Sequence, residues 1–293
     1  MAETVADPVP PLAPPSASSG LLEVFRRRYL LTLLVRREIS ARYQGSFLGM
    51  LWSYVNPLSQ FLIYYFVMGV VMGLDRGMEN FPIYIFSGLI IVHFFNETLN
   101  AGTRSIVRNK QLVRKMALPR EMFPVASMLV SAFHIGPQLV IMVAACFLVG
   151  WQPDLLGIAA GVLALLITMT VGTASALLFS VANVFMRDIS NLVNILTNLV
   201  RFGVPMIYPF TRITENLPNF VEIYLANPLA NAVLLFHRCF WTGTTSDPEA
   251  IIVTDLPNAL FLRGGIALLI GVVMLVIAQL VFIRFENKIP ERL

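Results

Sequence analysis

Long apolar stretches separated by short polar ones run through most of this 293-residue chain. Crossing the hydrocarbon core of a bilayer takes about 20 helical residues, so each long apolar stretch predicts a transmembrane helix. Six stretches reach that length, within one transmembrane domain over residues 47–293. We predict the six spans at about 47–73, 81–103, 122–149, 155–184, 189–210 and 262–284. The chain is therefore expected to be an all-α polytopic membrane protein.

Three further segments are predicted from polar or broken patterns. Residues 1–20 are rich in Pro, Ala and Ser and are expected to be disordered. Residues 21–46 hold a short apolar core between two arginine clusters, which favours an interfacial helix on the cytoplasmic membrane surface. In the stretch 215–241, Asn227-Pro228 breaks the apolar run, because proline disfavours helix in the residue before it. Each half is too short to cross, so we expect two re-entrant or surface helices on the outer side.

Composition and charge agree with this arrangement and orient it. The chain is 57% hydrophobic and 13% charged, with a mean hydropathy of +0.73. Six spans with both termini in the cytoplasm place about 16 of the 21 Lys and Arg residues on the cytoplasmic side, where membrane proteins concentrate them. A seventh span would put the basic C-terminal tail outside. We therefore favour six spans with cytoplasmic N and C termini.

Four of the predicted spans carry a polar face at helical spacing. Such a face either packs on a neighbouring helix through hydrogen bonds or borders a wet passage. The first span adds an aromatic stripe of Phe47, Tyr54, Phe61 and Tyr65, which suits ordinary packing or stacking on sugar rings. The polar faces comprise Ser53, Asn56, Gln60 and Tyr64 in the first span, His93, Glu97 and Asn100 in the second, Ser127, Ser131, His134 and Gln138 in the third, and Asn198 and Arg201 in the fifth.

Glu97 and Arg201 are the two charged residues within these predicted spans that need a partner. Charged groups inside a membrane usually face a cavity or an opposite charge. A Glu97–Arg201 ion pair and a cavity-facing role for either residue are both open from the sequence. His93 and His134 are interpreted as hydrogen-bonded packing residues rather than proton carriers.

Motifs for catalysis or nucleotide binding are missing from the sequence. There is no GxxxxGK[ST] phosphate-binding loop, no HExxH and no Gly-x-Ser-x-Gly. The three histidines lack metal-ligand spacing, and Cys146 and Cys239 are expected to be buried rather than joined in a disulfide. We expect no enzyme activity, no cofactor or metal in this chain and no nucleic-acid partner. Energy for uphill transport would have to come from another protein.

An ordered set of short motifs resembles one known family. The set comprises RYQGSFLGMLW from Arg42, FP and SGL from Phe81 and Ser87, NKQLVRKMALPREMFP from Asn109, FMRDI from Phe185, PMIY from Pro205, and Asn227-Pro228. Over most of residues 25–285 the chain resembles the transmembrane subunit of a type-2 ABC exporter of polysaccharide, the family that exports O-antigen, teichoic acid and lipid-linked galactan. Val92-His93 stands where the family often has Trp, and the Pro-rich tail lies outside the family pattern.

The resemblance implies a multi-pass permease of the inner membrane. It would be a homodimer bound to two copies of a separate ATPase subunit, which would hold ATP and Mg²⁺. It would move lipid-linked polysaccharide out of the cytoplasmic leaflet, along a passage lined by the polar and aromatic residues given above for the first, second and fifth spans. Two alternatives stay open: a type-2 permease for a drug or small lipid, and a channel or scaffold that needs no partner.

The resemblance also implies roles for residues outside the passage. Asn227 and Pro228 would belong to an outer gate. Arg36, Arg37 and Arg42 are candidate contacts of a lipid pyrophosphate, since guanidinium presents a two-pronged donor to phosphate, although anionic lipid headgroups suit them equally. Contacts with the ATPase subunit are expected from Arg108, Lys110, Arg114, Lys115, Arg120 and Glu121, and from Arg187 and Asp188.

Overall fold

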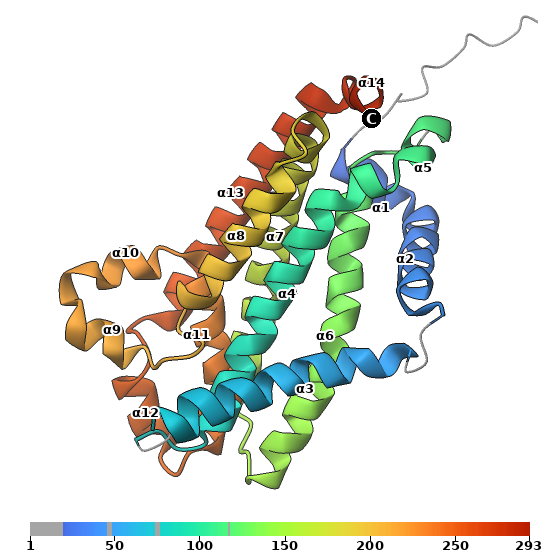
Figure 1. Ribbon diagram of the computed structural model, residues 1–293. Coiled ribbons are helices and arrows are strands. Elements are labelled where there is room, and N and C mark those ends of the chain that lie inside the picture. The colour runs from blue at the N-terminus through green and yellow to red at the C-terminus, as the bar shows by residue number, and fades with distance from the viewer. Residues whose placement is uncertain (1–19, 46–48, 74–76, 117) are drawn as a thin grey trace, which may run out of the picture.

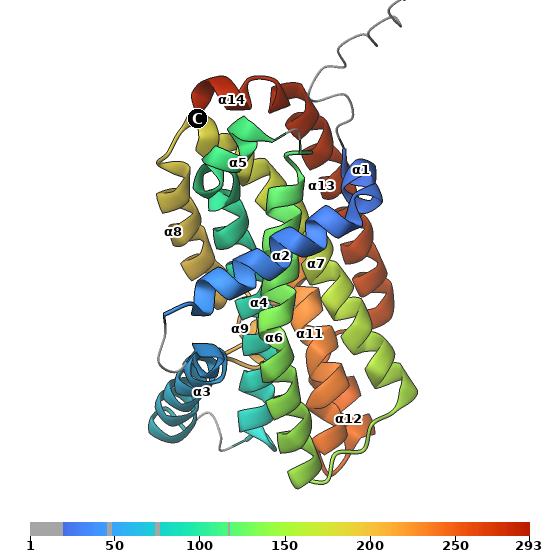
Figure 2. The ribbon, with the colours of Figure 1, turned by 90° about the vertical axis from the view of Figure 1, so that its right-hand side faces the viewer.

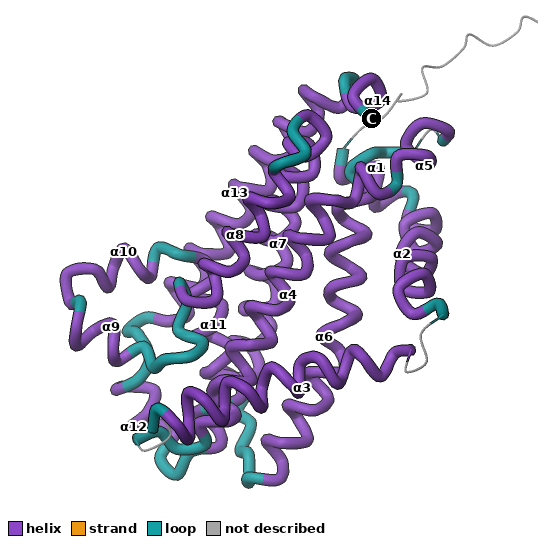
Figure 3. Tube along the Cα trace, viewed as in Figure 1, coloured by secondary structure: helices purple, strands orange, loops and turns teal. Residues whose placement is uncertain are grey.

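The computed structural model describes residues 20–45, 49–73, 77–116 and 118–293, in which all regular structure is helical (Figures 1 and 3). Apart from Gly20, the predicted disordered tail at 1–20 lies outside these residues, as does Phe47. The helices are α1 (Leu21–Arg26), α2 (Arg28–Tyr43), α3 (Trp52–Tyr64), α4 (Phe81–Arg108), α5 (Lys110–Lys115), α6 (Met122–Leu148), α7 (Leu155–Phe185), α8 (Ile189–Phe202), α9 (Thr211–Asn216), α10 (Val221–Leu225), α11 (Pro228–Phe240), α12 (Pro248–Thr254), α13 (Leu260–Glu286) and α14 (Ile289–Arg292). Short 3₁₀ turns occupy Gly49–Leu51, Pro218–Phe220 and Thr242–Thr244.

Five of the described helical segments are long and apolar enough to cross a membrane. They are Trp52–Val71, α4, α6, α7 and α13, and four of the predicted spans therefore match continuous α-helices closely in position. Helices α4, α6, α7 and α13 run side by side along one axis, and α4 is the most deeply buried of the five (Figures 1 and 2). Long apolar helices with small residues at their crossings are the expected solution inside a bilayer.

The predicted fifth span, 189–210, is not one continuous helix. Helix α8 has 14 residues and ends at Phe202, which at 1.5 Å per residue makes it about 21 Å long, well short of a bilayer core. Pro205 and Pro209 follow Gly203 and prevent the helix from continuing. The Tyr84 hydroxyl lies 2.9 and 3.0 Å from the carbonyl oxygens of Pro205 and Tyr208, and so stabilises the irregular segment.

The bent segment before α13 agrees with the predicted break. Pro218–Leu225 and Pro228–Thr244 meet at an angle of 93°, and they make a sixth candidate span only if the bent pair is counted as one. Asn227 begins α11 by accepting a hydrogen bond of 3.0 Å from the Leu229 amide, with Pro228 in the first turn. Helices α9 and α10 project sideways from the bundle (Figure 1).

Helices α2 and α3 stand apart from the parallel bundle. The predicted interfacial segment forms two helices, α1 and α2, and α2 packs on α6 (Figure 2). Helix α3 contains Pro57 and continues as a π-helical segment from Tyr65 to Val71. It lies across α4 and α6 rather than alongside them (Figure 1). The outward side of this segment is apolar, with Leu62, Phe66 and Val70 exposed.

Candidate functional site

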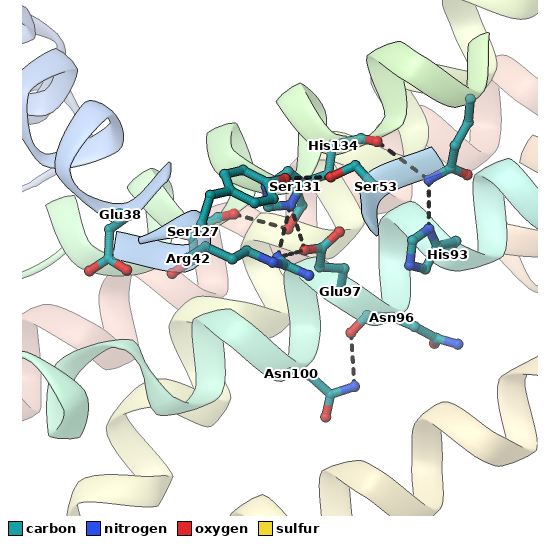
Figure 4. A network of polar contacts seen from close by, with 12 residues as sticks. Glu38, Arg42, Ser53, His93, Asn96, Glu97, Asn100, Ser127, Ser131 and His134 are labelled. Atoms are coloured by element: carbon teal, nitrogen blue, oxygen red, sulfur yellow. Dashed lines mark hydrogen bonds and ion pairs between the residues drawn. The ribbon is translucent and has the colours of Figure 1, made fainter. Parts of the chain in front are cut away.

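Two ion pairs join α2 to α4. Arg42 pairs with Glu97, and Arg108 pairs with Glu38 (Figure 4 shows the first pair). Glu38 also accepts a hydrogen bond of 3.1 Å from the Asn109 side chain. Residues four apart lie on one face of a helix, so α2 presents Glu38 and Arg42 together toward α4. We call these four residues, Glu38, Arg42, Glu97 and Arg108, the charge clamp.

Helix α6 adds a second layer of polar contacts around Glu97. His134 Nδ1 lies 2.7 Å from Glu97 Oε1 and 2.9 Å from Arg42 Nη1, so it donates to the carboxylate or accepts from the guanidinium according to its tautomer. The Gln138 amide nitrogen lies 2.8 Å from His93 Nδ1. The prediction that both histidines are hydrogen-bonded inside the protein is confirmed.

The sequence hypothesis of a Glu97–Arg201 pair is wrong. Glu97 is occupied by Arg42 and His134, which reach it from α2 and α6. Arg201 lies at the end of α8, and no hydrogen-bond or ion-pair partner of its guanidinium is recorded among the described residues. The partner of Glu97 thus comes from a helix that the sequence placed on the membrane surface.

A polar cavity of about 450 Å³ lies beneath α2, between that helix and helices α4 and α6. We call it the α2 cavity. Arg37 of α2 lines it together with the charge clamp, Asn109, Ser127 and Ser131. Three arginines and two glutamates give this lining a formal charge of +1. Arg36, the third predicted phosphate contact, is exposed and lies outside the cavity.

A second, smaller cavity of about 70 Å³ shares Arg42 and Glu97 with the first. Its lining includes Ser53 and Asn56 of α3, and Tyr43 of α2 hydrogen-bonds the Ser53 hydroxyl. The predicted polar faces of the first three spans therefore do meet around one point. Ser127, Ser131 and His134 of α6 and Glu38 of α2 belong to this site. The sequence analysis missed Glu38, which could have been found from its opposite charge to Arg42 four residues along α2.

The aromatic stripe of the first span packs against the protein itself. Phe61 and Tyr65 stack with ring centroids 6.1 Å apart, and Phe61 meets Phe86 of α4 edge to face at 5.2 Å. Tyr54, Gln60 and Tyr64 are half-buried on the same inward side of the segment. In this arrangement ordinary packing, one of the two alternatives from the sequence, accounts for Phe61 and Tyr65.

Helix α4 turns a different polar side toward α8. The Asn96 side-chain amide donates a hydrogen bond of 3.1 Å to the Thr197 carbonyl oxygen, and Arg104 donates one of 3.0 Å to the Asn194 side chain. The Asn100 side chain donates a hydrogen bond of 2.9 Å to the Asn96 carbonyl oxygen and lies on this side of α4 as well. Asn100, Asn198 and Arg201 are therefore not brought to the α2 cavity, and Asn198 is exposed on α8.

Of the predicted ATPase contacts, three are engaged inside the protein. Glu121 is fully buried and accepts a hydrogen bond of 2.9 Å from Gln279 of α13. Arg120 bonds the Glu286 carbonyl oxygen of α13, and Arg108 belongs to the charge clamp. Glu121 and Arg120 are thus held within the protein, whereas the Arg108 side chain stays 53% exposed. The exposed residues outside the charge clamp are Lys110, Arg114 and Lys115 of α5 and the Arg187-Asp188 turn, and contact with an ATPase stays a prediction for all of these residues.

The far end of the bundle is tied together by polar contacts between distant loops. Ser246 donates to both carboxylate oxygens of Glu79 at 2.6 Å, and these hydrogen bonds hold the Glu79 pKa below its ordinary value. Asp154 receives two hydrogen bonds from Arg238, of 2.9 and 2.6 Å, and caps α7 by accepting from the Gly157 amide. The Arg238 contact is the main reason that the pKa of Asp154 is lowered.

Comparison with known proteins finds similarity over most of the chain. A family-wide sequence model described as "ABC-2 type transporter" matches residues 29–241. The O-antigen export system permease protein RfbA of Myxococcus xanthus is 28% identical over 230 residues, covering 78% of this chain and 87% of the relative. Its namesake from Klebsiella pneumoniae is 28% identical over 216 residues, covering 73% and 81%. The polysialic acid transport protein KpsM of Escherichia coli is 21% identical over 236 residues, covering 80% and 90%.

Proposed function

The chain belongs to the ABC-2 type transporter family, and we propose that it is the permease subunit of an exporter of lipid-linked polysaccharide in the inner membrane. The observation that carries this proposal is the similarity to O-antigen export permeases along most of the length of both proteins. The relative that transports polysialic acid extends the similarity to a second kind of glycan. Transport runs outward from the cytoplasmic leaflet in this proposal, with both termini of the chain in the cytoplasm.

ATP hydrolysis is assigned to a separate subunit. The sequence has no phosphate-binding loop, so ATP and Mg²⁺ would be held by two copies of a partner ATPase. The surface proposed for this partner consists of Lys110, Arg114 and Lys115 of α5 with the Arg187-Asp188 turn. These residues are exposed, and α5 and the start of α8 lie at the same end of the bundle (Figures 1 and 2).

A second copy of the chain would complete the passage. Helix α8 exposes apolar Ile195 and Leu199 and also polar Asn191 and Asn198, although a helix in contact with lipid alone would expose apolar side chains only. A homodimer joined along α8 and α3 would cover the mixed surface of α8 and the apolar outward side of α3, and the glycan would pass between the copies. The bent segment around Asn227-Pro228 would close the outer end of that route.

The lipid pyrophosphate head would enter at the α2 cavity. Arg37 and Arg42 line this cavity, and Arg108 adds a third guanidinium that the sequence analysis had assigned elsewhere. Guanidinium groups make strong, charge-assisted hydrogen bonds to phosphate oxygens. The glycan would then reach the aromatic residues Phe61 and Tyr65 only after α3 moves away from α4, because Phe61 packs on Phe86 of α4 and Tyr65 stacks on Phe61.

Purification of the chain with its cognate ATPase tests this proposal. ATP hydrolysis by the reconstituted complex should rise on addition of a lipid-linked glycan and stay at its basal rate with drugs or short-chain phospholipids. Stimulation by drugs or small lipids alone would assign the protein to the other branch of type-2 permeases. Failure to retain any ATPase during purification would contradict the subunit assignment itself.

A further inference from the structure

The charge clamp fastens α2 to α4 across a gap. Glu38 and Arg42 are four residues apart on α2, about 6 Å of helix rise, whereas their partners Arg108 and Glu97 are separated by about 16 Å on α4. The two ion pairs therefore spread apart toward α4, with the α2 cavity between them. Helix α2 packs on α6 and reaches α4 mainly through these long side chains.

The two members of each ion pair differ in how firmly they are held. The arginine side chains remain 51% and 53% exposed for Arg42 and Arg108, whereas those of Glu97 and Glu38 are 10% and 15% exposed. Each carboxylate also has a second hydrogen-bond partner that does not depend on the arginine. His134 contacts Glu97 at 2.7 Å, and Asn109 contacts Glu38 at 3.1 Å. When the arginines leave, Glu38 keeps its Asn109 contact and Glu97 keeps only the His134 contact at Oε1, because Glu97 Oε2 is buried without a hydrogen-bond partner among the described residues. Departure of Arg42 is therefore the costlier of the two.

A polyanion cannot simply be added to this cavity. Its lining carries three guanidinium groups but also two carboxylates, and the carboxylates repel phosphate oxygens at short range. Binding becomes favourable when the anion takes the arginines over from the carboxylates. Three guanidinium groups, those of Arg37, Arg42 and Arg108, are then available to donate paired hydrogen bonds to the ligand.

We propose that the α2 cavity is a diphosphate site in which the ligand takes Arg42 from Glu97 and Arg108 from Glu38, so that headgroup binding unfastens α2 from α4. The class of ligand rests on the function proposed above. Arg42 lies in the last turn of α2, and α3 follows along the chain from residue 52. Release of α2 therefore frees the leading end of α3, the helix whose aromatic side packs on α4. Binding of the headgroup is thereby coupled to opening of the passage.

Binding of a short-chain prenyl pyrophosphate to the permease–ATPase complex in vesicles tests the exchange. Removing a competing carboxylate should tighten binding, whereas removing an arginine should weaken it. We expect Glu97→Gln and, independently, Glu38→Gln to lower Kd about tenfold, and Arg42→Gln and Arg108→Gln to raise it by about the same factor. Arg28→Gln is the matched control, because Arg28 is an exposed arginine of α2 outside the cavity, and the Kd of this variant should equal that of the wild type.

Opposite signs for the glutamate and arginine variants are the decisive result. If Glu38→Gln and Glu97→Gln, folded and with ATPase bound, left Kd unchanged or raised it, the exchange would be refuted while the proposed export function would stand. Inorganic pyrophosphate and vesicles of phosphatidylglycerol separate the ligand sources. Competition by phosphatidylglycerol as strong as that by prenyl pyrophosphate would overturn the diphosphate assignment and make the cavity an anionic-lipid site.

Release of α2 has its own measurement. Spin labels at Ser40→Cys on α2 and Asn287→Cys beyond α13 are on exposed positions outside the cavity, and both native cysteines are buried. The distance distribution between them should shift on adding prenyl pyrophosphate, and should already be shifted without ligand in the Glu38→Gln, Glu97→Gln double variant. An unchanged distribution with saturating ligand would show that α2 stays fastened and would overturn the proposal.

Discussion

Replacement of Gly102 by Ala tests a close contact between the two central helices, α4 and α7. A Cβ added at Gly102 would lie 2.4 Å from the Cβ and 3.2 Å from the Cα of Ala176, far inside van der Waals contact. These atoms belong to or adjoin the backbone of α7, so they cannot rotate away and the helices must separate. Overpacking of a dense core costs about 3 kcal/mol at the upper end of its usual range. The better helix propensity of Ala returns about 1 kcal/mol, which leaves a net loss of about 2 kcal/mol.

Gly265→Ala provides the matched control. Gly265 lies in α13 and is not followed by proline, and an added Cβ there meets no side chain or neighbouring helix within 4 Å. The same substitution should therefore be neutral or should stabilise the protein by up to about 1 kcal/mol through helix propensity alone. Thermal unfolding of the purified protein in detergent, followed by tryptophan fluorescence, should show a lower Tm for Gly102→Ala and an unchanged or higher Tm for Gly265→Ala. Equal Tm values for the two variants would refute the close packing of α4 on α7.

Three further variants test the two ends of the bundle and the aromatic stripe. Arg114→Glu with Lys115→Glu should reduce co-purification of the ATPase severalfold without lowering the Tm, and unimpaired retention would contradict the partner surface. Asp154→Asn should destabilise the protein by about 1 kcal/mol or less at pH 7 by weakening the Arg238 contact, because the Asp154 side chain is 46% exposed and Asn can still cap α7. Because the folded pKa of Asp154 is lowered, its contribution is present above the ordinary value and is lost as the pH falls through the lowered pKa, so wild type and variant should converge in acid and diverge at neutral pH. Tyr54→Ala should stall glycan export while the complex stays assembled, and normal export would remove Tyr54 from the passage.

Hydropathy predicted the bundle well because crossing a bilayer imposes a length and an apolar composition on each helix. Helices α4, α6, α7 and α13 match their predicted spans for that reason. The end of α8 was missed, since residues 203–210 are apolar enough to extend the run although Gly203, Pro205 and Pro209 end the helix. Backbone-breaking residues outweigh hydropathy at such a point.

The sequence pointed to several residues of the site but not to which residues pair with one another. Periodicity placed Ser53, His93, Glu97 and His134 on inward faces, and the structure brings them to two adjoining cavities. Periodicity within one helix carries no information on which helix lies opposite, so Arg201 of α8 was considered as a partner of Glu97, beside a cavity-facing role, and Arg42 of α2 was not.

Basic residues in loops posed a related difficulty. Arg120 and Glu121 follow α5 in a strongly basic segment, and such segments usually face the cytoplasm. Their partners Glu286 and Gln279 lie more than 150 residues away along the chain, on α13. Long-range contacts of this kind bury individual charges without changing the local charge pattern, so that pattern cannot predict them.

The central claim is that this chain carries lipid-linked polysaccharide across a membrane with energy from a separate ATPase. Its most direct test reconstitutes the chain with the cognate ATPase in sealed vesicles that hold a fluorescent lipid-linked glycan in the leaflet facing the ATPase. On addition of ATP, the account predicts that the glycan appears on the opposite face, and that it stays in place with a non-hydrolysable ATP analogue. A glycan that never crosses, under conditions in which the same complex hydrolyses ATP to move a drug or a small lipid, would contradict the claim.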